Sequence, residues 1–124
     1  MTVLIDSDVL IEVSRGRDTE VLRRWAELAD SDDVVLCSPV SVAELWHGAR
    51  PSERGILTSL FDALVCGSID AETGRRAGEY LRDYRKSHGV ELGDALIAAS
   101  AVQRRAALWT RNRKHYPMPG LRWF

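Results

Sequence analysis

Cysteine, lysine and long apolar stretches are scarce in this sequence of 124 residues. Its two cysteines, Cys37 and Cys66, are too few for a disulfide scaffold and do not form a Cys-x-x-Cys metal motif. Both lie in apolar, strand-like segments, so we expect buried, reduced thiols, as in cytoplasmic proteins. No apolar run is long enough to span a membrane, and the N-terminus does not resemble a signal peptide. The sequence therefore predicts a cytoplasmic protein without a membrane segment.

An excess of charge of one sign is also absent. The 17 Lys and Arg residues balance 18 Asp and Glu residues, giving a net charge of −1, which argues against a polybasic nucleic-acid binder. Only Lys86 and Lys114 are lysines, so arginine carries nearly all the positive charge. Arginine binds phosphate in a bidentate manner, so local patches remain compatible with nucleic acid. The length predicts one domain over residues 1–124.

Short apolar runs alternate with amphipathic segments, which predicts strands alternating with helices. The expected strands are residues 3–5, 34–37, 64–69, 107–110 and 121–124. The expected helices are a segment capped by Ser7 or Asp8 that ends at Arg15, then 19–29, 41–48, 52–63, 70–87 and 93–105. This order predicts an α/β fold with a mainly parallel sheet of four to five strands flanked by helices.

Polar residues follow the ends of the first and fourth expected strands. These residues are Asp6, Ser7 and Asp8 after the first strand and Thr110, Arg111 and Asn112 at the end of the fourth. The carboxyl ends of parallel strands meet at one edge of a sheet, where ligands bind in α/β folds. We therefore expect these side chains to lie along one edge.

Three carboxylates lie in otherwise apolar segments: Asp6, Glu44 and Asp94. Taken singly, Asp6 and Asp94 are also explained as helix caps, and Glu44 as the partner of an arginine. Together they predict an acidic cluster, in which each pair at about 4 Å repels by about 4 kcal/mol. A proton, an arginine or a divalent cation must offset that repulsion. Oxygen ligands without cysteine favour Mg²⁺ or Mn²⁺ over Zn²⁺.

Four motifs occur in a fixed order along the chain: residues 4–10 (LIDSDVL), 42–48 (VAELWHG), 93–99 (GDALIAA) and 108–112 (LWTRN). With these motifs the chain resembles the PIN domain family, specifically its VapC-type toxin ribonucleases, from the first strand to the last. The resemblance implies a three-layer sandwich around a central, mainly parallel twisted sheet. It also implies an endoribonuclease dependent on Mg²⁺, with Mn²⁺ able to substitute, that acts as the toxin of a toxin–antitoxin pair.

The resemblance also assigns roles to residues. The positions that match the family's catalytic set are Asp6, Glu44, Asp94 and Asn112, and the first three match its metal-binding acids. Asn112 stands where relatives often carry Asp, so a second metal ion would be held less firmly. Thr110 and Ser7 match polar positions that support the site. The reaction implied is hydrolysis of an RNA phosphodiester by a metal-activated water, leaving a 5′-phosphate.

The partners implied by the resemblance are RNA, a small cognate antitoxin protein and a second copy of the chain in a homodimer. Three arginines flank the expected strand ends and are candidates for RNA contacts, although each is also explained as a solvated surface charge: Arg15, Arg111 and Arg113. Trp46, Trp123 and Phe124 either meet a partner or complete the chain's own core.

Other functions remain open from the residues alone. His47 and His115 would suit a metal-free ribonuclease that uses two imidazoles as acid and base. Asp6-Ser7-Asp8 resembles the start of a haloacid-dehalogenase-type phosphatase, but Leu10 departs from that motif. A receiver domain would need a phosphoacceptor aspartate that the second and third strand ends lack. A catalytically silent PIN-like binding module is the remaining alternative.

Overall fold

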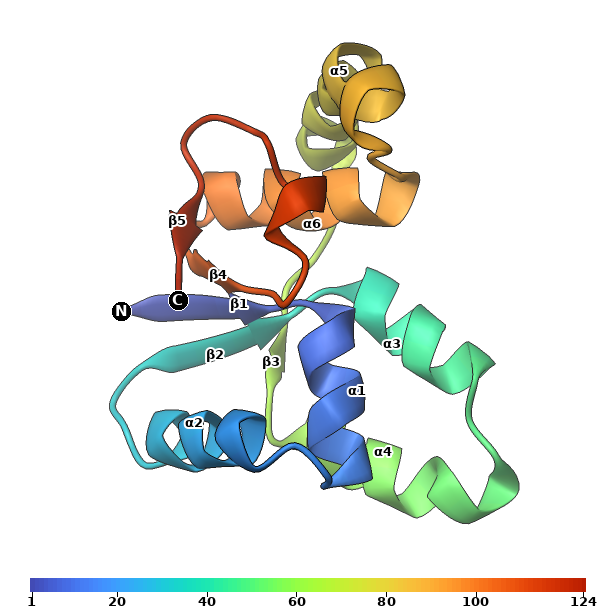
Figure 1. The fold of residues 1–124 in the computed structure, drawn as a ribbon, viewed down its shortest axis with the longest axis vertical. Coiled ribbons are helices and arrows are strands. Elements are labelled where there is room, and N and C mark those ends of the chain that lie inside the picture. The colour runs from blue at the N-terminus through green and yellow to red at the C-terminus, as the bar shows by residue number, and fades with distance from the viewer.

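A computed structural model describes all 124 residues and has a central sheet between two layers of helices (Figure 1). The strands are β1 (Thr2–Ile5), β2 (Val34–Cys37), β3 (Val65–Cys66), β4 (Ala107–Trp109) and β5 (Arg122–Trp123). All neighbouring strands are parallel, in the order β3-β2-β1-β4-β5. The predicted α/β sandwich with a parallel sheet is therefore confirmed.

Six helices cover the two faces of this sheet. They are α1 (Ser7–Arg15), α2 (Thr19–Ala29), α3 (Pro39–His47), α4 (Arg54–Asp62), α5 (Ala71–His88) and α6 (Leu92–Gln103), with short 3-10 turns η1 (Pro51–Glu53) and η2 (Arg113–His115). Helices α1 to α4 lie on one face and α6 on the other, with α5 outermost (Figure 1). None of these helices combines the length and apolar character needed to cross a bilayer.

The central strand β1 has apolar side chains on both faces, as its continuous apolar sequence predicts for a buried parallel strand. Leu4 contributes to the core beneath α5 and α6, whereas Val3 and Ile5 contribute to the core beneath α1 to α4. All three side chains are at most 1% exposed. Two cores thus fix the position of β1, and with it the residue at its carboxyl end.

Helix α6 is rich in small residues, and this composition sets how closely it packs. Ala95, Ala98, Ala99 and Ala101 are all buried, in the same core cluster as residues of β1, β4 and α5. Small side chains allow short distances between backbones. The first turn of α6, which carries Asp94, is therefore held near the sheet.

Two expectations fail at the β3 edge of the sheet. The strand expected over residues 64–69 has only two residues, Val65 and Cys66, and both are exposed. The expectation that Cys66 is buried is therefore wrong, whereas Cys37 is buried as expected. The reason is topological, because β3 is an edge strand that pairs only with β2.

Helix boundaries differ where capping decides them. Helix α1 begins at Ser7 with Asp6 as its N-cap, so Ser7 and Asp8 are not the cap that was expected. Helix α3 begins at Pro39, not at residue 41, because the Ser38 side chain accepts the Val40 N–H and proline suits the first helical position.

Two further helices are shorter than expected. The helix expected over residues 52–63 is divided into η1 and α4. Helix α6 begins at Leu92 and ends at Gln103, two residues before the expected end, and Arg105 then adopts a left-handed φ of 53°. The last two strands are also shorter than expected: Thr110 lies outside β4, and Leu121 and Phe124 lie outside β5.

Candidate active site

Asp6 lies at the carboxyl end of the central strand, beside the end of β4. Ile5 is paired with Trp109, and the Asp6 N–H donates a hydrogen bond of 2.9 Å to the Trp109 carbonyl. This register places Asp6 next to Thr110. Asp6 is only 7% exposed, so its charge needs hydrogen-bond partners within the protein.

The Asp6 carboxylate accepts three hydrogen bonds. Its Oδ1 accepts the Ser7 N–H at 2.8 Å, and its Oδ2 accepts the hydroxyls of Thr110 at 2.8 Å and Tyr116 at 2.9 Å. Capping of α1 explains the bond to Oδ1. The two hydroxyl bonds come from residues more than 100 positions away and have no part in capping, so Asp6 is more than a helix cap.

Ser7 and Ser41 connect helix α1 to helix α3, which carries Glu44. Their hydroxyl oxygens are 2.7 Å apart, and both residues are buried. Glu44 is exposed to solvent, yet its Oε1 lies against the first turn of α6. A Cβ atom at Gly93 would stand only 3.2 Å from that oxygen. Glu44 therefore lies beside the residue that precedes Asp94.

Asp94 occupies the first turn of α6 and is half-buried. Its Oδ2 accepts the Glu91 N–H at 3.1 Å, so Asp94 also takes part in capping. The same oxygen lies 3.6 Å from Nδ1 of His115, in the η2 turn. Asp94 thus combines the structural role that its position suggested with a place at the edge of the acidic site.

The acids of the site influence one another's pKa. Partial withdrawal from water raises the pKa of Glu44, Asp6 and Asp94 raise it further, and Ser7 opposes the rise. Burial likewise raises the pKa of Asp94, while the Glu91 N–H and His115 lower it and Asp6 raises it. A cation between these carboxylates would remove the cause of this mutual repulsion.

Asp8, one of the two residues expected to cap the first helix, has a different environment. Its Oδ2 accepts the Arg111 N–H at 3.0 Å, whereas its buried Oδ1 has no hydrogen-bond partner. Burial, together with the nearby charge of Asp6, raises the pKa of Asp8 to about 6. A fourth carboxylate, poorly compensated by the protein, therefore lies close to Asp6.

The segment from Asn112 to Tyr116, which includes η2, spans the site from β4 to α6. The Asn112 N–H donates to Thr110 Oγ1 at 3.0 Å, and Asn112 Nδ2 lies 2.9 Å from His115 Nδ1. The Asn112 amide therefore faces His115. Tyr116, at the end of this segment, is the site residue that the sequence did not reveal, since no motif or periodicity marks it.

The three arginines considered for RNA binding have different surroundings. Arg111 forms ion pairs with Glu12 at 3.4 Å and Asp18 at 3.5 Å. The Arg113 guanidinium lies over the Trp123 ring, 4.9 Å from its centre. Arg15 has only a 3.9 Å contact to Glu12 and lines a hollow that also contains Glu44.

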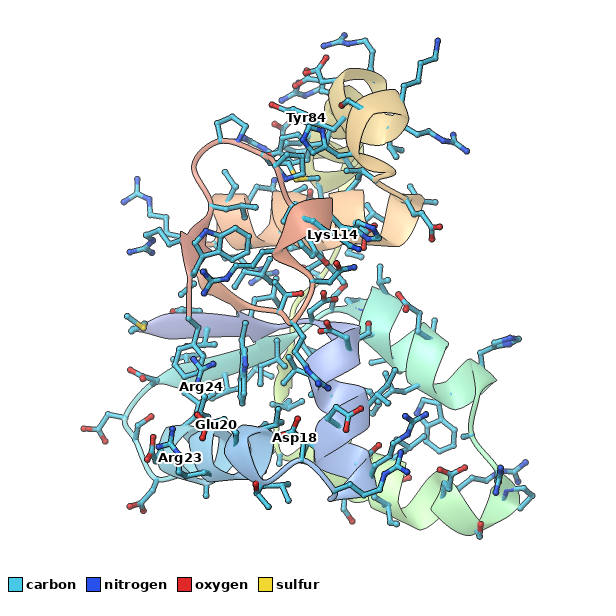
Figure 2. The ribbon with its side chains drawn as sticks, viewed as in Figure 1. Asp18, Glu20, Arg23, Arg24, Tyr84 and Lys114 are labelled. Atoms are coloured by element: carbon cyan, nitrogen blue, oxygen red, sulfur yellow. The ribbon has the colours of Figure 1, made fainter.

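The aromatic residues considered as partner contacts differ in how far they are covered by the chain itself. Arg24, labelled in Figure 2, reaches from α2 over Phe124 and Trp109, with distances of 4.5 and 4.9 Å to the ring centres. Phe124 therefore completes the chain's own core. Trp123 and Trp46 are 37% and 38% exposed.

Of the two histidines of the metal-free alternative, only His115 contacts a carboxylate of the site; His47 is exposed at the end of α3.

The donor set fits a hydrated Mg²⁺ or Mn²⁺ ion, since the converging groups are carboxylates whose charges repel. The side chains do not form a closed cage, because no three His, Cys, Asp or Glu residues are close enough together to surround an ion. Mg²⁺ usually binds proteins through one or two carboxylates and retains several waters. Asp6 and Asp94, with Glu44 beside them, would therefore hold such an ion partly through water.

Two proteins named as ribonucleases are similar in sequence to most of this chain. Ribonuclease VapC10 of Mycobacterium tuberculosis (strain CDC 1551 / Oshkosh) is 40% identical over 117 residues, which cover 94% of this chain and 86% of that protein. Ribonuclease VapC19 of the same strain is 34% identical over 116 residues, covering 93% and 92% of the two chains.

Solved structures share the fold. The VapBC2 structure from Rickettsia felis, bound to a promoter DNA fragment, has a TM-score of 0.83 at 21% identity and covers 100% of this chain and 98% of that chain. The structure of FitAcB from Neisseria gonorrhoeae has a TM-score of 0.74 at 24% identity, and the match covers 98% of this chain and 96% of that chain. The profile of the PIN domain family matches residues 3–121. With this profile spanning nearly the whole chain and relatives at 40% and 34% identity, the chain belongs to the PIN domain family and, within it, to the VapC ribonucleases.

Proposed function

We propose that this protein is a Mg²⁺-dependent endoribonuclease that acts as the toxin of a toxin–antitoxin pair, with Mn²⁺ able to substitute. The observation that carries the proposal is the approach of three acids: Glu44 lies against Gly93, next to Asp94, and burial together with the charges of Asp6 and Asp94 raises the pKa of Glu44. The similarity to proteins named ribonuclease VapC10 and VapC19 supports the choice of RNA as substrate.

Each acid has a role that follows from its surroundings. Asp6, held by three hydrogen bonds, keeps a fixed orientation and contributes an anchoring oxygen for the cation. Asp94 contributes a second oxygen from the first turn of α6. When bound, the cation polarises the phosphodiester and makes water a stronger nucleophile.

Glu44 is suited to handle the attacking water. It is the most exposed of the three acids, and a carboxylate within hydrogen-bond reach of the water can accept its proton. Glu44 would orient the water and take its proton. Water would then attack phosphorus in line as the bond to the 3′-oxygen breaks, and that oxygen would take a proton from solvent, which leaves a 5′-phosphate and a 3′-hydroxyl.

The RNA backbone would approach through a basic hollow next to the acids. This hollow, of about 550 Å³, has no apolar lining residue and is formed by Ser14, Arg15, Arg17, Gly48, Arg50 and Glu53. It shares Ser14, Arg15, Gly48 and Glu53 with the smaller hollow that contains Glu44. The two hollows thus form a path that leads to the acidic site.

Two arginines of this path differ from the paired arginines of α2 and α5. Arg23 and Arg75 form close ion pairs with glutamates on α2 and α5, and Arg23 and Glu20 are adjacent in Figure 2. Arg17 and Arg50 have no ion pair, so their guanidinium groups are available for phosphate. The negative charge of Glu53 disfavours an anion in this hollow, but the Glu53 carboxylate already accepts a hydrogen bond of 2.9 Å from the Arg50 N–H.

Cleavage of RNA with and without a divalent cation tests the proposal. The wild type should cut single-stranded RNA in Mg²⁺ or Mn²⁺, stop in EDTA and leave 5′-phosphate ends. Asp94→Asn and Asp6→Asn should each reduce the rate at least about a hundredfold, whereas the control Asp83→Asn, on the exposed side of α5, should not. Full activity in EDTA, or of Asp6→Asn, would contradict the assignment.

Binding of uncleaved RNA tests the path separately. In the Asp94→Asn background, Arg17→Gln with Arg50→Gln should weaken binding of single-stranded RNA and reduce the salt slope by about one for each arginine removed. The matched control is Arg23→Gln with Arg75→Gln, which removes two arginines already paired with glutamates. Equal affinities and slopes for the two double variants would exclude the path.

A small antitoxin protein and a second copy of the chain are the proposed partners. The exposed Trp46 on α3 offers apolar surface for a partner helix, and several structural relatives are described as VapBC or toxin–antitoxin complexes. Light scattering of the purified protein, alone and after co-expression with the neighbouring reading frame, should give a dimer and a larger complex. A monomer in both cases would contradict both partners.

A further inference from the structure

The two oxygens of Asp6 have unequal hydrogen bonding. A carboxylate oxygen accepts about two hydrogen bonds, one for each lone pair. Oδ2 receives two, from the hydroxyls of Thr110 and Tyr116. Oδ1 receives one, from the Ser7 N–H. Only Oδ1 therefore retains a lone pair for another partner.

The direction of the Thr110 hydrogen bond follows from its neighbours. The Asn112 N–H donates to Thr110 Oγ1 at 3.0 Å, so that oxygen acts as an acceptor on one side. Its own proton is then left for Asp6 Oδ2, at 2.8 Å. A chain of two hydrogen bonds thus runs from the backbone after β4 to the carboxylate.

The Tyr116 hydroxyl is also fixed as a donor. An ionised carboxylate oxygen only accepts hydrogen bonds, so the Tyr116 hydroxyl is the donor in its 2.9 Å contact with Asp6 Oδ2. Tyr116 is 3% exposed within the core beneath α5 and α6. Its ring also packs edge-on against Trp123, with 6.5 Å between ring centres. A ring so enclosed holds its hydroxyl in one place.

We infer that Tyr116 is a positioning residue for the cation site: together with Thr110 it occupies Asp6 Oδ2 and leaves Oδ1 as the oxygen that binds the cation. This inference rests on the proposed function, because it assumes that Asp6 binds a divalent cation. Without the Tyr116 hydroxyl, the carboxylate could rotate and Oδ2 would compete with Oδ1. The expected result is weaker cation binding by a protein that remains folded.

Thermal unfolding of wild type and Tyr116→Phe across a Mg²⁺ titration tests the inference without measuring activity. A cation that binds the native state raises the melting temperature, and the response gives the apparent Kd. Tyr116→Phe should raise this Kd about 10- to 100-fold, the usual effect of losing a group that orients a metal ligand. The matched control is Tyr80→Phe, a buried tyrosine of the same core without a hydrogen bond to the site.

Three outcomes overturn the inference. The first is an unchanged Kd for folded Tyr116→Phe, and the second is an equal increase for Tyr80→Phe, which would indicate a packing effect. The third is a wild type whose melting temperature does not respond to Mg²⁺, in which case the cation of the proposed function also fails. The first two leave the proposed function intact, so the failures are distinguishable.

Substitution of Thr110 provides a rescue experiment. Thr110→Ser retains the hydroxyl and should bind Mg²⁺ within about threefold of wild type, whereas Thr110→Val, of similar shape, should bind as weakly as Tyr116→Phe. Since both hydroxyls act on one oxygen, combining Thr110→Val with Tyr116→Phe should give less than the product of the two effects. Equal affinities for Thr110→Ser and Thr110→Val would contradict the role of the hydroxyl pair.

Discussion

Asp6 and Glu44 belong to one acidic site, but the protein treats them differently. Asp6 is buried and receives three hydrogen bonds from Ser7, Thr110 and Tyr116. Glu44 has more contact with solvent, and partial burial together with the nearby charges of Asp6 and Asp94 raises its pKa. The fold surrounds Asp6 with hydrogen-bond donors but gives Glu44 neighbours of like charge. Asp6 is therefore part of the protein's own architecture, whereas the balance of charge around Glu44 depends on what binds at the site.

Removal of the Asp6 side chain should give the largest change in stability. Asp6→Ala leaves the Ser7 N–H and the hydroxyls of Thr110 and Tyr116 without their acceptor, so we expect a loss of about 3 kcal/mol in the free energy of unfolding. Urea unfolding in EDTA measures this loss. Asp6→Asn, which keeps one acceptor oxygen, should lose less. If Asp6→Ala were as stable as wild type, the hydrogen bonds to Asp6 would not be structural.

Asp8 should make the unfolding free energy depend on pH. Its pKa is raised from 3.8 to about 6 in the folded state, so its contribution is favourable at low pH and is lost as the pH rises through 6. Between pH 5 and 7.5 the metal-free protein should lose about 1 kcal/mol through Asp8, after allowance for its contact with solvent. Asp8→Asn should remove that part of the decline. If the unfolding free energies of wild type and Asp8→Asn had the same pH dependence, Asp8 would not be the cause of the decline.

Glu44 should show the smallest effect, and one of opposite sign to that of Asp6. Because partial burial and the charges of Asp6 and Asp94 raise its pKa, Glu44→Gln should stabilise the metal-free protein at pH 7.5, by at most about 1 kcal/mol for so exposed a side chain. Saturating Mg²⁺ should remove or reverse this gain, because wild type then binds the cation more tightly. Differential scanning calorimetry with and without Mg²⁺ measures both. If Glu44→Gln were less stable than wild type in EDTA, the proposed difference between Glu44 and Asp6 would be wrong.

The sequence predicted those parts of the site that local patterns mark. Apolar runs located β1 and β4, and strand ends in a parallel sheet meet at one edge, which brought Asp6 to Thr110. Tyr116 could not be found in this way, because it follows an irregular segment and its contact with Asp6 spans 110 residues. The surroundings of Asp8 depend on the backbone of Arg111, which no motif records.

The incorrect predictions have two physical causes. Residues 64–66 form an apolar run that suits a strand, but whether these residues are buried depends on neighbours that the run does not specify. At an edge of the sheet those neighbours are missing, so β3 is short and Cys66 is exposed. The division of the segment 52–63 reflects a capping interaction, in which the Glu53 carboxylate accepts the Arg50 N–H.

Gly93 shows how an absent methyl group lets side chains of α3 lie against the first turn of α6. An alanine there would favour the helix by up to about 1 kcal/mol, but its Cβ would stand 3.2 Å from Glu44 Oε1 and 3.3 Å from a Val40 methyl. A single added carbon would therefore crowd Glu44 without removing any acid. Helix propensity and the close approach of Glu44 conflict at this position, and glycine permits the close approach.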